Sequence, residues 1–155
     1  MAVLRKKEGC SSFCKSGELR ILTKTEQQQV APFLDLFHGT YRVYSYHDNL
    51  VVVPTSEPIP QTKILACFVK LGSIEHGRFV PHHQFFKAYG TSCIHQLNLT
   101  REDPRVAAYL RGEEIFCEAF EGYGTVLLEG VPLGFGKVSQ NRLKNHYPKG
   151  LRTLF

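Results

Sequence analysis

Near its end the chain reads Gly130-Val-Pro-Leu-Gly-Phe-Gly-Lys137, and it continues through Arg142-Leu-Lys-Asn-His-Tyr-Pro-Lys-Gly-Leu-Arg152. All 14 Asp and Glu residues lie at or before Glu129, so the net charge of +5 is carried by the last 25 residues. In this segment cations alternate with aromatic rings and an amide, a mixture that phosphates and exposed bases use together. The segment therefore predicts a surface for a polyanion, above all a nucleic acid. The alternative is a basic face that is only solvated.

The length of 155 residues and the 43% apolar content suit one compact domain, or two small ones that share a core. The longest apolar runs, Leu50–Val53 and Ile64–Val69, are too short to span a bilayer. The first residues also lack the apolar centre of a secretion signal. We therefore expect a cytoplasmic protein without a membrane partner.

The cysteines are odd in number and show no paired spacing, which favours a reducing compartment over a disulfide framework. No second Cys or His pair follows the close pair Cys10 and Cys14 at a spacing typical of zinc sites, so we expect no metal. Two others lie in apolar runs and are expected in the core, namely Cys67 and Cys117.

The first half of the chain predicts a small helix-plus-hairpin unit. Thr23 and Glu26 form a capping box for a helix that Gly39 would close, with Pro32 as a kink or a late start. Residues 41–53 have the alternation and turn residues of a hairpin, and the prolines in 54–60 indicate a subdomain boundary. Strands are then expected at 64–71, 73–75 and 78–80, separated by glycine or a His-Gly turn.

The second half predicts a barrel with flanking helices. Pro81 and Gly90 bound a helix over 82–89, and a second helix starts at Thr100 and ends at Gly112. Strands are expected at 93–99, 113–120, 124–128 and 132–138. The sum is an α+β protein, most economically a small β-barrel flanked by helices.

Catalytic motifs are missing from the sequence. It contains no G-x-G-x-x-G that opens a βαβ unit, and Gly134-Phe-Gly-Lys137 lacks the first Gly and the Ser or Thr of a Walker loop. It also contains no G-x-S-x-G and no cysteine tied to a nearby His. We therefore do not expect the chain to be an enzyme by itself.

The terminal motif quoted above closely resembles that of bacterial rRNA cytosine-5 methyltransferases of the RsmF type, in the NOL/NOP/Sun family. Leu71-Gly-Ser-Ile-Glu-His-Gly-Arg-Phe-Val-Pro-His-His83 and Tyr109-Leu-Arg-Gly-Glu113 resemble two upstream segments of that family. Together these pieces cover residues 65–152 in the family's order and spacing. One departure is Phe135, which stands where relatives often carry Trp.

The resemblance implies a PUA-like RNA-binding domain over 63–155, preceded by a small α/β subdomain over 20–62. Residues 1–19 would be a remnant strand and linker, which we expect to be mobile, and the chain would be the C-terminal part of such an enzyme. The family's catalytic cysteines follow Pro and Thr, and no cysteine here does. The chain would hold no cofactor, because S-adenosylmethionine binds in the catalytic domain of the parent enzyme.

The resemblance and the basic tail together imply that the chain positions ribosomal RNA for a methyltransferase catalytic domain, supplied in cis or in trans. The cations would bind phosphates. The amide of the Asn and the imidazole of the His would hydrogen-bond sugar or base edges, and the Phe ring would stack on a base. These roles give the candidate set Lys137, Arg142, Lys144, Lys149, Arg152, Asn145, His146 and Phe135. The alternatives are an interdomain docking module with little RNA affinity, a free-standing RNA-binding regulator and, for Asn145 alone, a bond to the local backbone.

Overall fold

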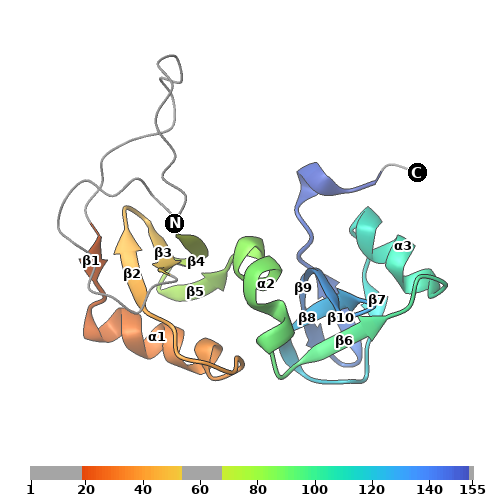
Figure 1. The fold of residues 1–155 in the computed structure, drawn as a ribbon, viewed down its shortest axis with the longest axis horizontal. Helices are drawn as coiled ribbons and strands as arrows, with labels where there is room; N and C mark the ends of the chain where they lie inside the picture. The colour runs from red at the N-terminus through yellow and green to blue at the C-terminus, as the bar shows by residue number, and fades with distance from the viewer. Residues whose placement is uncertain (1–18, 54–67, 154–155) are drawn as a thin grey trace, which may run out of the picture.

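The computed structural model describes residues 19–53 and 68–153, which form two lobes with helix α2 (His83–Tyr89) between them (Figure 1). The first lobe is an antiparallel five-stranded sheet of order β1-β2-β3-β4-β5 with helix α1 (Lys24–Leu34) packed against it. Its strands are β1 (Arg20–Ile21), β2 (Val43–Tyr46), β3 (Asn49–Val52), β4 (Val69–Glu75) and β5 (Arg78–Pro81).

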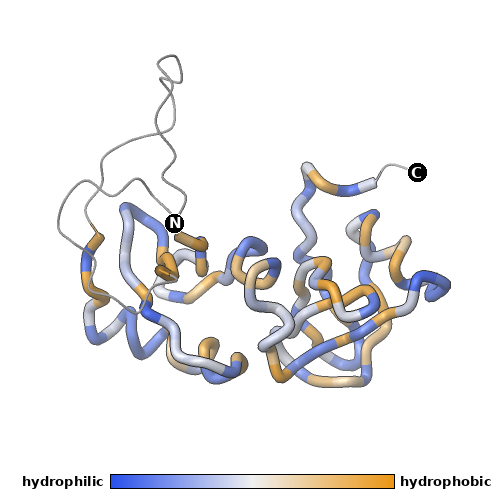
Figure 2. The backbone as a smooth tube through the Cα atoms, viewed as in Figure 1, coloured by the Kyte–Doolittle hydropathy of each residue, from blue (hydrophilic) through white to orange (hydrophobic). Residues whose placement is uncertain are grey.

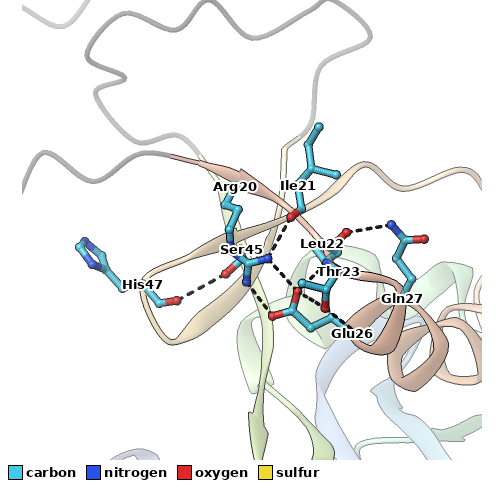
Figure 3. Close-up of polar contacts among 8 residues, drawn as sticks. All are labelled: Arg20, Ile21, Leu22, Thr23, Glu26, Gln27, Ser45 and His47. Atoms are coloured by element: carbon cyan, nitrogen blue, oxygen red, sulfur yellow. Dashed lines mark hydrogen bonds and ion pairs between the residues drawn. The ribbon is translucent and has the colours of Figure 1, made fainter.

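The predicted capping box starts helix α1 (Figure 3). The hydroxyl of Thr23 accepts a hydrogen bond from the Glu26 N–H at 3.3 Å, and the Glu26 carboxylate accepts one from the Thr23 N–H at 2.7 Å. Arg20 on β1 pairs with the same carboxylate at 2.7 Å, which ties the strand to the helix. The helix ends at Leu34, ahead of the expected Gly39, and Pro32 lies within its last turn.

The hairpin expected over 41–53 is confirmed by the pairing of β2 with β3. The two runs expected at 64–71 and 73–75 correspond, in the described residues, to one strand, β4, which continues through Gly72. Glycine fits there because a Cβ atom would lie only 2.6 Å from the ring of Phe79 on β5. The His76-Gly77 turn is confirmed, and both residues have positive φ, as a tight hairpin turn requires.

The boundary expected between residues 62 and 63 lies outside the described residues, as do most of residues 1–19 and the prolines of 54–60. The strands that follow it nevertheless join the first lobe, because β4 pairs with β3 and β5 pairs with β4. The first sheet therefore continues to Pro81, and residues 69–81 are part of it and not of the second domain, to which we assigned them. Pro81 ends β5, where we expected the first turn of a helix.

The second lobe is a curled five-stranded mixed sheet of order β6-β8-β9-β10-β7. Strands β6 and β8 are parallel, and helix α3 (Pro104–Arg111) follows β6. Asp103, and not Thr100, caps α3, which ends at Gly112 with φ +86° as predicted. The strands are β6 (Gln96–Leu99), β7 (Ile115–Phe116), β8 (Gly122–Leu128), β9 (Val131–Ser139) and β10 (Arg142–Asn145). Strand β10 was not predicted, but the α+β class is confirmed.

Each lobe has its own hydrophobic core, and apolar segments run through both (Figure 2). The first core is aromatic and includes Phe33, Phe37, Phe85 and Phe86. The second lies inside the curled sheet and is largely aliphatic, with Tyr109 fully buried in it. Cys117 is buried there, as predicted, whereas Cys10, Cys14 and Cys67 lie outside the described residues. In the described parts of the chain, no helix is long and apolar enough to cross a membrane.

Candidate nucleic-acid interface

Two of the predicted cations lie side by side across the second sheet. Lys137 on β9 is the cross-strand partner of both Lys144 on β10 and Tyr123 on β8. Both lysines are exposed, and the Lys137 ammonium lies 5.4 Å from the centroid of the Tyr123 ring. This row of Tyr123, Lys137 and Lys144 is called the cationic row below.

The charge of the cationic row is not neutralised within the described residues. Like charges that face each other directly across two strands repel, which makes such a pair unfavourable without an anion. Over residues 19–53 and 68–153, neither lysine forms an ion pair with a carboxylate. The row therefore has the geometry and the charge of an anion-binding surface.

His146 lies next to the cationic row, just after β10. Its ring stacks on Phe135 with centroids 4.9 Å apart and meets the Tyr123 ring edge-on at 6.1 Å. Burial, and then the charges of Lys144 and Lys137, lower the pKa of the imidazole below its ordinary value. The ring is therefore neutral near pH 7, where it can hydrogen-bond but adds no charge.

Phe135 does not occupy the exposed position that its predicted role requires. Its side chain is 3% exposed, and its ring is parallel to that of Phe86 on α2, with centroids 4.2 Å apart. Because one face is covered by Phe86 and the other by His146, no base can stack on it in this structure. Phe135 is a core residue that joins β9 to α2, which corrects the assignment to RNA binding.

Asn145 and Arg152 are engaged by the backbone of their own lobe. The Asn145 amide donates to the carbonyls of Tyr109 and Glu113 at 2.8 and 2.9 Å, and its oxygen accepts from the Tyr147 N–H at 2.7 Å. The Arg152 guanidinium donates to the Tyr147 carbonyl at 3.3 Å and covers Gly112. For Asn145 the alternative of a local backbone bond therefore describes what the structure contains.

The two remaining cations are not part of the cationic row, although Arg142 lies two residues before Lys144 on β10 and therefore on the same face of that strand. Arg142 is exposed at the start of β10 and approaches Glu114 at 4.0 Å. Lys149 is exposed in the short 3-10 helix η2 (Lys149–Leu151), beyond the end of β10. The segment after η2 is bonded to α3, since the Thr153 N–H donates to the Leu110 carbonyl at 3.1 Å. The eight predicted residues thus divide into an exposed group and a packed group.

Sequence reasoning missed Tyr123, which completes the cationic row. The signal was present as an aromatic residue between two glycines, Gly122 and Gly124, but that segment was interpreted as a turn and a strand start. Its place opposite Lys137 follows from the register of β8 and β9, which the sequence does not state. Among the described residues, no group of three or more His, Cys, Asp and Glu side chains is placed to hold a metal ion.

Comparison with known families places the second lobe. The family described as the methyltransferase RsmF PUA domain matches residues 96–153, from the first residue of β6 to just beyond η2. No curated protein matches the chain. The matched segment contains the curled sheet, helix α3 and the cationic row. Over residues 96–153 the chain is therefore similar to the PUA domain of RsmF methyltransferases.

Proposed function

We propose that this chain binds ribosomal RNA through the cationic row and holds it for a methyltransferase catalytic domain, in cis or in trans. The coarser function, an RNA-binding domain associated with methyltransferases, follows from the family of residues 96–153. The single observation that supports the cationic row as the contact surface is the pair of opposed lysines without a carboxylate partner in the described residues.

The row suits single-stranded or looped RNA. The two ammonium groups would contact successive phosphates, while the Tyr123 ring offers a face or an edge to a base. Most of the affinity in recognition of this kind is electrostatic, and so the affinity falls as the salt concentration rises. The chain would contribute recognition to the methyl transfer, and S-adenosylmethionine would bind in the catalytic domain, not in the residues described here.

The test is the affinity of the whole chain for labelled small-subunit rRNA fragments, measured by fluorescence anisotropy at several salt concentrations. Each phosphate contact on a single strand contributes about −0.7 to the log–log slope, so Lys137→Gln with Lys144→Gln should reduce the slope by about 1.4. At 0.1 M salt this corresponds to a loss of roughly twentyfold in affinity.

The matched control removes two exposed cations outside the proposed surface, through Lys24→Gln and Arg101→Gln. It changes the net charge equally, so a general charge effect would weaken both double variants alike. The proposal predicts that the slope of log affinity against log salt concentration becomes less steep only in the variant of the cationic row. Equal losses in the two variants, or no binding by the unaltered chain at low salt, would refute it.

The alternative of a docking module has one observation in its favour. Phe135, from the terminal motif, is packed against α2 and not exposed, so part of the motif holds the two lobes together. Docking of this lobe on a separate catalytic domain through apolar contacts would be almost insensitive to salt, unlike RNA binding. The salt series therefore separates the two functions.

A further inference from the structure

A cavity of about 340 Å³ lies where the two lobes meet, between α1, β5 and β8. Its walls are mainly apolar: three rings, Phe33, Phe79 and Tyr123, line it together with Pro32 and Leu36. The volume is at the lower end of the range of about 300–1,000 Å³ found for small-ligand pockets. Because the walls come from both lobes, the cavity depends on their relative position.

Phe33 contacts both other rings of the cavity wall. Phe33 lies 4.9 Å from Phe79 between centroids and meets Tyr123 edge-on at 6.2 Å. Phe33 is buried, whereas Phe79 and Tyr123 are only partly buried. Flat apolar walls of this kind accept an unstacked base, since every base has a π face.

Two polar groups line the same cavity, and each has unused binding capacity. Arg78 is exposed, and its guanidinium forms no ion pair within the described residues. The Gln29 amide donates to the Gly77 carbonyl at 2.8 Å, but its buried oxygen has no partner among the described residues. A buried acceptor without a donor is costly, so a ligand that donates a hydrogen bond there would be favoured.

Tyr123 connects this cavity to the cationic row. Tyr123 lines the cavity, and the Lys137 ammonium lies 5.4 Å from the centroid of its ring. A nucleotide placed at Tyr123 can therefore put its base into the cavity and its phosphates towards Lys137 and Lys144. A peptide would use the apolar walls but not the row of cations, so the charge favours RNA as the occupant.

We propose that the cavity between the lobes accepts one unstacked RNA base that carries an exocyclic amine, with Tyr123 as the stacking wall and the Gln29 oxygen as the acceptor. This inference rests on the proposed function, because the base belongs to the RNA held by the cationic row. It adds a preference that the row cannot supply, namely a base with an exocyclic amine (adenine, cytosine or guanine) over uracil at one position.

The first experiment places a reporter in the cavity. The chain contains no tryptophan, so Tyr123→Trp introduces a single indole, and a base stacked on it should quench its fluorescence. Tyr44→Trp, on β2, is the matched control and should not respond. Short A-rich and C-rich oligoribonucleotides should quench the indole of the Tyr123→Trp variant more strongly than U-rich ones of equal length.

The second experiment measures affinity by anisotropy with the same oligoribonucleotides. Tyr123→Ala should weaken binding roughly tenfold, as expected for the loss of one stacked base. Gln29→Leu should remove the preference for A-rich and C-rich over U-rich strands. Gln28→Leu, the same change at the exposed neighbour on α1, should leave the preference intact.

The outcomes separate this inference from the proposed function. If the chain binds RNA through Lys137 and Lys144 but the indole of Tyr123→Trp is not quenched and Gln29→Leu keeps the base preference, the cavity does not hold a base. If no RNA binds at low salt, the proposed function itself fails. Quenching of that indole by a protein partner but not by any oligoribonucleotide would assign the cavity to protein docking and overturn the inference.

Discussion

The two faces of strand β9 differ in the side chains that they can accommodate. On one face Gly134 and Gly136 pack against the second core, where a Cβ at Gly134 would lie 2.6 Å from the Tyr109 hydroxyl. On the other face Phe135 is buried under α2, and Lys137 is exposed two residues later. One short motif thus contains packing glycines, a ring that joins the lobes and a surface cation. Its resemblance to a family motif does not by itself identify the residues that touch a ligand.

The largest loss of stability should come from the buried ring. Phe135→Ala removes a side chain held between Phe86 and His146 in the first core, and the cavity left behind should lower the free energy of unfolding by about 3–5 kcal/mol. Urea denaturation followed by circular dichroism measures this. A loss below about 1 kcal/mol would mean that the ring is not a core residue, and would restore its candidacy for RNA stacking.

The second largest loss of stability should come from a substitution on the glycine face of β9. In Gly136→Ala the new methyl group would lie 2.6 Å from Leu143 Cγ and 2.8 Å from the Lys144 carbonyl oxygen, which is backbone and cannot turn away. Overpacking of this kind costs about 1–3 kcal/mol in unfolding free energy. Gly150→Ala is the matched control, since nothing lies within 4 Å of its Cβ position. Equal stability of the two variants would show that the glycines of β9 are not needed for packing.

A partly buried histidine packs on each face of β9, so the free energy of unfolding should depend on pH. His83 lies against Gly134, and burial, Lys87 and His82 lower its pKa to about 4. His146 covers Phe135 and also has a lowered pKa, through burial, Lys144 and Lys137. The unfolded chain takes up these protons near pH 6.5, whereas folded His83 does so only near pH 4. Stability should therefore fall as the pH drops from 7 towards 4.

The size of this effect is moderated by solvent, because both rings are only partly buried. We expect the free energy of unfolding to decrease by about 1–2 kcal/mol between pH 7 and pH 4.5. Urea titrations at both pH values provide the measurement, and His83→Gln should show a smaller decrease than the unaltered chain. Unchanged stability across this range would contradict the lowered pKa values.

Local signals predicted much of the fold. The capping box at Thr23 and Glu26 starts α1, the His76-Gly77 turn joins two strands, and Gly112 ends α3, each where its backbone chemistry requires. These features depend on neighbours within a few residues. The charge asymmetry likewise predicted that the exposed cations would be found in the terminal segment.

Features that depend on distant partners could not be predicted in this way. Strand β10 has a single buried apolar residue, Leu143, between two cations, so it resembles a solvated tail until β9 and β7 pair with it. The burial of Phe135 depends on α2, which precedes it by about fifty residues. The backbone partners of Asn145 lie on α3 and before β7, more than thirty residues away. Packing, not residue type, therefore decided which predicted site residues are exposed.

The smallest effect on stability and the clearest effect on RNA should come from Lys144→Gln. The side chain is exposed and unpaired within the described residues, and it faces Lys137, so its removal relieves repulsion. The free energy of unfolding should stay within about 0.5 kcal/mol of the unaltered chain, while RNA affinity at 0.1 M salt should fall about fivefold, the effect of one phosphate contact. Urea denaturation and anisotropy on one preparation give both values. A loss of stability above about 1 kcal/mol would place Lys144 among the packing residues, and the two faces of β9 would then no longer divide structure from recognition.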